Sequence, residues 1–442
     1  MIDTLLPAPV QARERIPTLD IIRGVAVCGI LLMNITAFGM PVRAYADPTV
    51  YGGAEGANLW AWIINAMLFE GTQRGLFTLL FGAGVVLFTE RMEASQRSDA
   101  IDLYFRRNLW LVVFGVVHGF LLWFGEILFA YGIIALFVYA FRKAKPATLL
   151  LVALGGLAFN AAWYQLDVYN AIKVHERMQE ALVAQQHNEQ LTSRQREAIE
   201  AWNVVVKEMK PDGTAIREVV DASRGPYFRQ VLFQAPIRNE MQIHLVYRLF
   251  FDMFSMMLIG MALFKWGVLS LGLPRRIYVY MVLIGYGIGL SVNFFEVRHL
   301  VKGNFSVLAF LQSDVTYDAG RLAMTTGHVG MLMLFCGAPV FGGLKRRLSA
   351  VGQMAFTNYV SQSVICATIF FGFGFSLFGQ FQRYELYYVV LGVWVTQLIV
   401  SPIWLTHYQY GPLEWLWRTL TYGKLQRMRR STSVGATIEQ SS

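Results

Sequence analysis

Polar side chains inside long apolar segments are the groups of this sequence that could do chemistry. His118 lies ten residues past Asn108 within the apolar stretch 108–141, which is about 15 Å along a helix. An imidazole, whose unperturbed pKa is about 6.5, exchanges a proton close to neutral pH. Glu126 follows eight residues later, so the pair could form a general base oriented by a carboxylate. The structural alternative is a histidine that only bonds a neighbouring helix.

Three further candidates belong to the first apolar segment, 19–38. Asp20 could favour the start of a helix, and Arg23 could anchor the segment at the membrane surface. Asn34 follows Asp20 by 14 residues, about 21 Å along a helix, where its amide needs a partner. Ionisable groups inside a membrane are costly, so binding a substrate and packing helices both stay open for these residues.

Two pairs of opposite charges have the i, i+4 spacing that places side chains on one helix face. We expect Arg248 and Asp252 to pair with each other. Glu70 and Arg74 fall where the polar piece 70–74 interrupts an apolar stretch. Irregular backbone at membrane depth is tolerated where it is buried in protein or lines a water-filled cavity. This second pair is therefore predicted to line a cavity.

The elements that position these groups follow from composition. Of the 442 residues, 55% are hydrophobic and 15% are charged, against about 25% charged in a soluble domain. The mean hydropathy is +0.43. The three cysteines lie in apolar stretches and no spacing suits a metal. These observations argue against a soluble enzyme, a disordered scaffold and a disulfide-rich secreted protein, and they predict an all-α membrane bundle.

Ten membrane spans are predicted, because a span needs about 20 mostly apolar residues. The stretch 59–69 is interpreted as a short interfacial helix. The stretch 108–141 is too long for one crossing and has basic residues at both ends, so we expect a hairpin that turns near residues 124–126. The ten spans are 19–38, 75–88, the two arms of 108–141, 147–163, 245–264, 277–295, 322–341, 354–371 and 386–405.

Basic residues gather in alternate connections, which places both termini in the cytoplasm. The net charge of +9 is then interpreted as a cationic cytoplasmic surface that faces anionic lipid, and not as a site that binds nucleic acid. Four parts follow: a bundle over 1–163, an external segment over 164–243 with two amphipathic helices, a second bundle over 244–405, and an amphipathic, basic tail over 406–442. The basic residues include Arg13, Arg15, Arg91, Arg97, Arg106, Arg107, Lys145, Arg275, Arg276, Lys345, Arg346 and Arg347.

Five segments together resemble the YeiB-like family of bacterial integral membrane proteins. They are Leu19–Asn34, Leu76–Gly84, the Arg106–Arg107 hairpin with His118 and Gly125–Leu128, Thr357–Ser363, and Tyr410–Tyr422. That family is similar to transmembrane acyltransferases, which include heparan-alpha-glucosaminide N-acetyltransferase. The resemblance implies a multi-pass protein of the inner membrane that transfers an acyl group from cytoplasmic acyl-CoA to a hydroxyl or amine acceptor beyond the membrane.

The resemblance also implies site residues. The Asp-x-x-Arg-Gly opening, with an asparagine 14 residues after the aspartate, is shared with that acetyltransferase and supports Asp20, Arg23 and Asn34. The acetyltransferase has a catalytic histidine 11 residues after the asparagine, where this sequence has Tyr45, so His118 is the candidate base here. Acyl-CoA, possibly acetyl-CoA, is the expected co-substrate, with no tightly bound cofactor. The predicted catalytic groups are His118, Asn34 and Glu126, and the predicted donor-binding groups are Asp20, Arg23, Arg74, Arg106, Arg107, Asn358 and Gln362.

Two other classes of protein stay open. A transporter or lipid flippase without covalent chemistry would line its path with the same intramembrane charges. A scaffold or sensor would bind a partner through segment 164–243. The expected partners of the enzyme are membrane lipids, acyl-CoA and an external acceptor, without nucleic acid, and a homodimer is left open.

Overall fold

Helices make up the architecture. The computed structural model describes residues 16–96 and 98–430, and the regular elements in these two ranges are helices, beside one isolated β-bridge between Tyr408 and Arg429. Arg13, Arg15 and Arg97, which the topology prediction used, lie outside the described residues. The elements are α1 (Pro17–Gly39), η2 (Val42–Tyr45), α2 (Gly56–Leu68), α3 (Thr72–Ala94), α4 (Ala100–Leu121), α5 (Leu128–Val138), η3 (Tyr139–Phe141), α6 (Pro146–Gln186), α7 (Ser193–Met209), α8 (Gly213–Ser223), α9 (Tyr227–Tyr247), α10 (Phe250–Lys265), η4 (Val268–Ser270), α11 (Arg275–Lys302), α12 (Val307–Ser313), α13 (Tyr317–Gly337), α14 (Gly342–Gln353), α15 (Ala355–Phe370), α16 (Leu386–His407) and α17 (Pro412–Tyr422).

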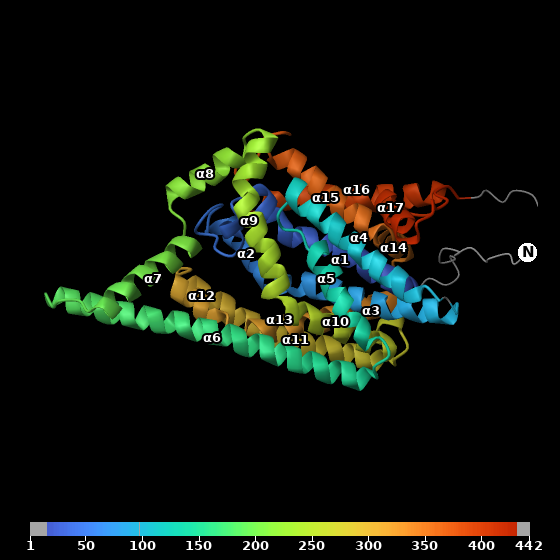
Figure 1. Cartoon of the computed structure of the whole chain (residues 1–442), viewed down its shortest axis with the longest axis horizontal. Coiled ribbons are helices and arrows are strands. Elements are labelled where there is room, and N and C mark those ends of the chain that lie inside the picture. The colour runs from blue at the N-terminus through green and yellow to red at the C-terminus, as the bar shows by residue number, and fades with distance from the viewer. Residues whose placement is uncertain (1–15, 97, 431–442) are drawn as a thin grey trace, which may run out of the picture.

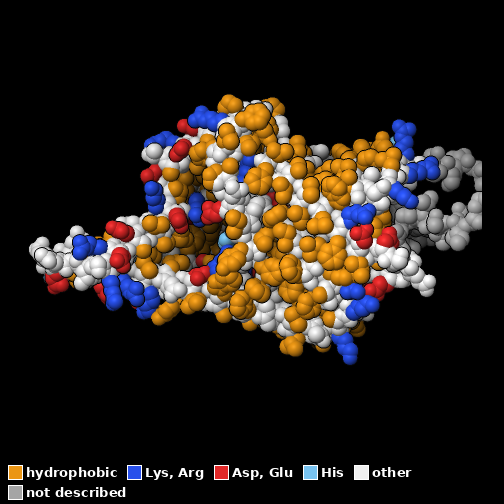
Figure 2. All heavy atoms as spheres, in the orientation of Figure 1, with side chains coloured by type: hydrophobic (Ala, Val, Ile, Leu, Met, Phe, Trp, Pro, Cys, Tyr) orange, Lys and Arg blue, Asp and Glu red, His pale blue; other side chains and the backbone are white. Residues whose placement is uncertain are grey.

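Apolar side chains cover much of the outer surface, as Figure 2 shows for one face. Leu151 of α6, Leu283 of α11 and Leu391 of α16 are 72%, 64% and 57% exposed. Within the described ranges, five stretches are long and apolar enough to cross a membrane: Pro17–Gly39, Gly56–Ala94, Pro146–Gln186, Arg275–Lys302 and Leu386–His407. Large apolar patches facing outward are stable in lipid and not in water. The chain is therefore a multi-pass membrane protein.

The predicted hairpin over 108–141 is confirmed. Helix α4 ends at Leu121, α5 begins at Leu128, and the two helices pack side by side. The predicted break after residue 69 is also present, because Gly71 between α2 and α3 has a φ of 66°, which glycine adopts without steric cost. Helix α5 has 11 residues, which is shorter than a full crossing.

The segment 164–243 forms an arch at the end of the molecule away from α14 and α17 (Figure 1). The two predicted amphipathic helices correspond to α7 and α8, and they are flanked by the outer half of α6 and by α9. Helix α6 is one continuous helix of 41 residues that crosses residue 164. Thr192 forms a capping box with Gln195 at the start of α7. We call this side of the molecule the arch end.

The opposite side, where α14, α17 and the start of α1 lie, is the tail end (Figure 1). The tail helix α17 folds back against α4 and α15. Helix α14, which carries Lys345, Arg346 and Arg347, is an additional surface helix that the span prediction did not include. Part of the basic charge of this end thus sits on the short helices α14 and α17.

Close contact between α3 and α10 depends on glycine. A Cβ at Gly82 would lie 1.9 Å from Met257 O, and a Cβ at Gly260 would lie 1.9 Å from Leu79 O. Real side chains cannot approach a carbonyl oxygen that closely, so the two backbones touch because neither position has a Cβ. This contact fixes α3, whose opposite side faces the cavity described next.

Candidate active site

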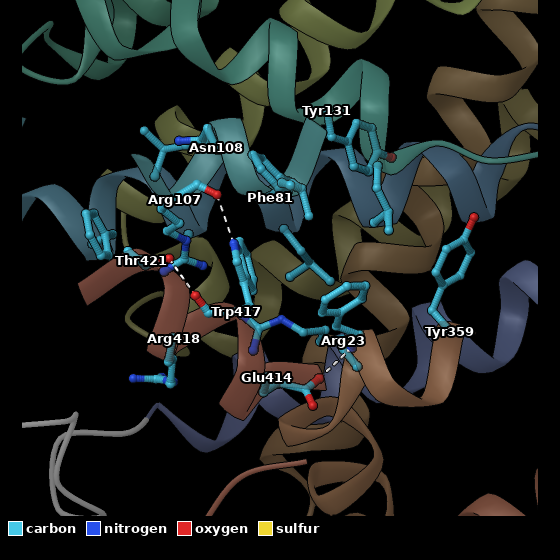
Figure 3. Close-up of a pocket in the computed structure, with 18 of the residues that line it drawn as sticks. Arg23, Phe81, Arg107, Asn108, Tyr131, Tyr359, Glu414, Trp417, Arg418 and Thr421 are labelled. Atoms are coloured by element: carbon cyan, nitrogen blue, oxygen red, sulfur yellow. Dashed lines mark hydrogen bonds between the residues drawn. The ribbon is translucent and has the colours of Figure 1, made fainter. Parts of the chain in front are cut away.

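A deep pocket opens at the tail end between α3, α4, α5, α15 and α17 (Figure 3). It holds about 1330 Å³ of empty space, its open mouth included. We call it the tail-end pocket. Its walls are formed by Arg23, Phe77, Leu80, Phe81, Gly84, Val85, Phe88, Tyr104, Arg107, Asn108, Leu111, Leu128, Tyr131, Gly352, Gln353, Ala355, Phe356, Tyr359, Glu414, Trp417, Arg418, Thr421 and Tyr422.

The mouth of the tail-end pocket is cationic. Arg23, Arg107 and Arg418 line it. The Arg107 guanidinium lies 4.4 Å from the centre of the Trp417 ring, and the Trp417 indole N–H donates to Arg107 O at 2.8 Å. A guanidinium stacked on an indole is oriented at little entropic cost. These arginines form a site suited to anionic groups such as phosphates.

Glu414 is the carboxylate that lines the same pocket, and its oxygens are occupied. They accept hydrogen bonds from the backbone N–H of Phe356 at 2.7 Å and from Thr357, both its N–H at 3.1 Å and its hydroxyl at 2.5 Å. Glu414 therefore caps the first turn of α15 from a distant helix. Burial raises the pKa of this carboxyl, although the bonds from Thr357 oppose the shift. The pocket is thus lined by three arginines and by one carboxylate, which already accepts hydrogen bonds from residues of α15.

The throat of the pocket is apolar and ends at two tyrosines. Phe77, Leu80, Phe81, Val85, Leu111 and Leu128 form its walls. Figure 3 shows Tyr131 and Tyr359 on the side of the pocket away from Arg418 and Thr421. The Tyr131 hydroxyl is 2.7 Å from Thr78 Oγ1. The Tyr359 hydroxyl is buried; its oxygen lies near the backbone N–H of Ile127, and its own O–H donates to no group in the described ranges.

Directly behind Tyr359 lies the pair His118 and Ser363. His118 Nε2 is 2.9 Å from Ser363 Oγ, and the rings of His118 and Tyr359 are 5.2 Å apart. Their exposures of 3% and 2% show that both members of the pair are buried. His118 Nδ1 has no hydrogen-bond partner among the residues that the structure describes. This arrangement resembles a nucleophile with its adjacent base.

Glu126 is near this pair, but its hydrogen bonds go to the backbone of α5. It is fully buried, and its carboxylate accepts from the backbone N–H of Leu128 and, at 3.1 Å, of Phe129. No hydrogen bond joins it to His118 in the described part of the chain. Glu126 caps α5, because the first N–H groups of a helix lack partners within it. The arch also reaches this region, since Gln242 Nε2 would lie 3.0 Å from a Cβ on Gly119.

The predicted donor-binding arginines separate into two groups. Arg23 lines the pocket and pairs with Asp20 at 3.1 Å, and Arg107 lines it next to Trp417. Arg106 is not part of the pocket wall: it pairs with Asp102 at 2.6 Å, its side chain is 43% exposed, and it also donates to Thr421 O of α17 at 3.4 Å. Neighbouring arginines of one helix therefore face different surroundings.

The remaining predicted residues lie outside the pocket wall. Asn34 is half-buried on α1, and no side-chain hydrogen bond of it is recorded in the described ranges. The Asn358 amide donates to Val351 O and to Ser401 Oγ, both at 3.0 Å. The Gln362 amide donates to Val27 O at 3.2 Å and to Gln397 Oε1 at 3.1 Å. The last two amides connect α15 to α1, α14 and α16, as interhelical bonds do in membranes.

Arg74 belongs to a buried ion-pair network instead. Asp252 accepts from Arg74 at 3.1 Å and from Arg321, which also pairs with Asp318 at 3.0 Å. The network joins α3, α10 and α13. Close by, Glu70 accepts from the hydroxyls of Tyr45 and Tyr317.

The predicted pairing of Arg248 with Asp252 is wrong. Arg248 pairs with Asp167 of α6, and its guanidinium lies 4.8 Å from the centre of the Trp163 ring. The reason is a helix boundary, because α9 ends at Tyr247 and α10 begins at Phe250. The spacing rule for one helix face does not apply across such a break.

Sequence reasoning singled out neither Tyr359, Ser363 nor Glu414 by itself. Tyr359 and Ser363 are four residues apart in the segment Thr357–Ser363, so they share a face of α15. This four-residue spacing is the sequence pattern that could have indicated that the two side chains act at one place. Glu414 had none, because its role depends on α17 folding back onto α15.

The fold is that of an all-helical, multi-pass membrane protein. Its site is a mostly apolar pocket that has arginines at its mouth and ends near a histidine–serine pair. The chain belongs to the YeiB family: it is 31% identical over 413 residues to "Uncharacterized protein YeiB" of Escherichia coli (strain K12), covering 92% of this chain and 96% of that protein. It is 28% identical over 444 residues to "Uncharacterized protein YxaH" of Bacillus subtilis (strain 168), covering 96% and 99%. Residues 263–424 match the family "Protein of unknown function (DUF418)". No solved structure matches the chain.

Proposed function

We propose that this protein is a membrane-bound acyltransferase that takes an acyl group from acyl-CoA bound in the tail-end pocket and passes it to a hydroxyl or amine acceptor at the arch end. The proposed topology has ten spans in the bacterial inner membrane, with the tail end in the cytoplasm. Basic surface helices at the tail end support that orientation, because positive residues favour the cytoplasmic side. Acyl-CoA is then available where the pocket opens.

The observation that carries the proposal is the polarity gradient of the pocket. Figure 3 shows Arg107 and Arg418 on one side of the pocket and Tyr131 and Tyr359 on the other. Arg23 also lines the pocket, and most of the remaining lining side chains are apolar, with Tyr104 and Asn108 among the exceptions. A coenzyme A thioester has the matching order, with phosphates at one end and the thioester and acyl chain at the other. Phosphates pair well with arginine forks, and an acyl chain gains free energy from apolar walls.

The proposed reaction takes place at the end of the throat. A nucleophile attacks the thioester carbonyl carbon, its proton passes to His118, and the carbon–sulfur bond breaks. His118 then gives the proton to the departing CoA thiolate, which balances the step. The Tyr359 hydroxyl, whose O–H donates to no group in the described ranges, is the polar donor best placed for the developing oxyanion, and such donors contribute about 3–4 kcal/mol. The sequence predicted that Asn34 binds the oxyanion, and this role of Asn34 remains a prediction.

Substituting Arg107 tests donor binding with a control on the same helix. Arg107→Gln is expected to weaken binding of acetyl-CoA about 10- to 100-fold, which matches about 1.5–3 kcal/mol for a charge-assisted contact. Arg106→Gln removes the same charge from the next residue, which reaches the pocket wall only through a long bond of 3.4 Å to Thr421 O, so it should change the dissociation constant less than about threefold. Calorimetric titration of the purified variants measures both. Equal losses in the two variants would contradict a donor site in this pocket.

Transport without covalent chemistry is the second candidate. It is favoured by the buried network of Arg74, Asp252 and Arg321, because charges inside a membrane often mark a path for ions or polar substrates. The two candidates differ in whether CoA thiol is released. An acyltransferase releases free thiol from acyl-CoA in proportion to acylated acceptor, whereas a transporter moves its substrate unchanged across a sealed vesicle.

A further inference from the structure

The pair His118 and Ser363 has no part in donor binding, because neither residue lines the tail-end pocket. Their contact is a direct one, with 2.9 Å between His118 Nε2 and Ser363 Oγ. A serine hydroxyl this close to an imidazole can lose its proton to the ring while it attacks a carbonyl carbon. We propose that Ser363 is an acyl-accepting nucleophile and His118 its base, so that transfer proceeds through an acyl-serine; this inference rests on the proposed acyltransferase function.

The position of Ser363 fits a relay between two sides of the membrane. Tyr359 lines the pocket, and Ser363 follows it by one helical turn on the same face of α15. On the other side of His118, α4 meets Gln242 of the arch helix α9. Ser363 therefore stands between the end of the donor pocket and the elements of the arch end. A carrier hydroxyl there allows donor and acceptor to use the centre one after the other.

Tyr359 separates the pocket from the pair in this structure. Its ring contacts the His118 ring; its oxygen lies near the Ile127 backbone N–H, and its O–H has no acceptor in the described part of the chain. A buried hydroxyl without a partner is costly, so a group that binds it gains free energy. The carbonyl oxygen of a thioester supplies that partner. A donor whose thioester reaches Tyr359 would thus displace the ring and bond its hydroxyl.

Atoms and charges balance in both half-reactions. First, Ser363 Oγ attacks the thioester carbonyl carbon, His118 Nε2 takes the serine proton, the carbon–sulfur bond breaks, and the CoA thiolate leaves with that proton. Second, the acceptor's hydroxyl or amine attacks the ester carbonyl carbon and gives a proton to His118. The bond to Ser363 Oγ then breaks, and the serine regains its proton. These steps require the neutral tautomer of His118 that carries its proton on Nδ1, because Nε2 must be free to accept the serine proton.

Trapping the intermediate tests the inference. Purified full-length protein is mixed with radiolabelled acetyl-CoA, without acceptor, and quenched in acid. We expect a burst of about one CoA thiol per protein and a label on the peptide that contains Ser363. The label should resist neutral hydroxylamine, as oxygen esters do. In Ser363→Cys the same label should become sensitive, because thioesters are cleaved under these conditions.

Ser361→Ala is the matched control, because the Ser361 hydroxyl donates to Asn358 O at 2.9 Å on the same helix. It should keep the burst, whereas Ser363→Ala should lose it at least 100-fold and still bind acetyl-CoA. A wild type that transfers acyl groups at full rate without any label, or a label on another residue, would overturn the acyl-serine and leave the proposed function standing. A wild type that neither binds acetyl-CoA nor releases thiol would overturn both.

Discussion

His118→Ala is expected to abolish acyl transfer and to leave acyl-CoA binding unchanged. A positioned general base contributes typically 10²- to 10⁴-fold to the rate, so the variant should lose at least about 100-fold. Binding should persist because His118 lies behind Tyr359 and is not part of the pocket wall. Thiol release from acetyl-CoA measures the rate, and calorimetric titration measures the binding.

His328→Ala is the control for the loss of any buried imidazole. His328 is 6% exposed, and its Nδ1 lies 2.8 Å from Met324 O of its own helix. This variant should keep both activity and binding. Normal transfer in His118→Ala would remove His118 from the mechanism, and with it the base that the acyl-serine requires.

Asp252→Asn is expected to destabilise the fold by about 3–5 kcal/mol, the cost of breaking a buried ion pair from one side. The substitution leaves the guanidinium groups of Arg74 and Arg321 without their shared carboxylate inside the bundle. Asp318→Asn should cost much less, because Asp318 is 29% exposed and bonds only one of these arginines. Thermal unfolding of the purified variants in one detergent compares them.

The same substitution separates the two candidate functions. If the network of Arg74, Asp252 and Arg321 supports the helices, Asp252→Asn lowers the unfolding temperature, and the folded fraction retains acyl transfer. If the network forms a transport path, the variant stays as stable as the wild type and loses transport of its substrate into vesicles. A stable Asp252→Asn protein would therefore contradict a structural role for the network.

Much of the helical framework could be predicted from apolar length alone. The hairpin of α4 and α5 and the break at Gly71 follow from a run too long for one crossing and from a polar interruption. Helix α5 has 11 residues, and its length and composition could not reveal which group accepts hydrogen bonds from its first backbone N–H groups. That group is Glu126, which accepts backbone hydrogen bonds there, and its catalytic role remains a prediction. The ten-span count remains a prediction.

The site was predictable only where one helix carries the signal. Arg107 and Arg106 are adjacent in sequence and both basic, and only the packing of α17 decides that Arg107 faces the pocket. Arg248 and Asp252 had the spacing of a pair, but a helix boundary between them directs each to a different partner. Contacts such as that of Glu414 with α15 join residues almost sixty positions apart. Local spacing contains no information about such contacts.

The most direct test of the central claim is a cryo-electron microscopy structure of the protein with a non-hydrolysable thioether analogue of acetyl-CoA. We predict density in the tail-end pocket, with the phosphates at Arg23, Arg107 and Arg418 and the thioether sulfur close to Tyr359. An empty tail-end pocket at saturating analogue, or an analogue bound elsewhere, would contradict the claim that this protein uses acyl-CoA from its tail end.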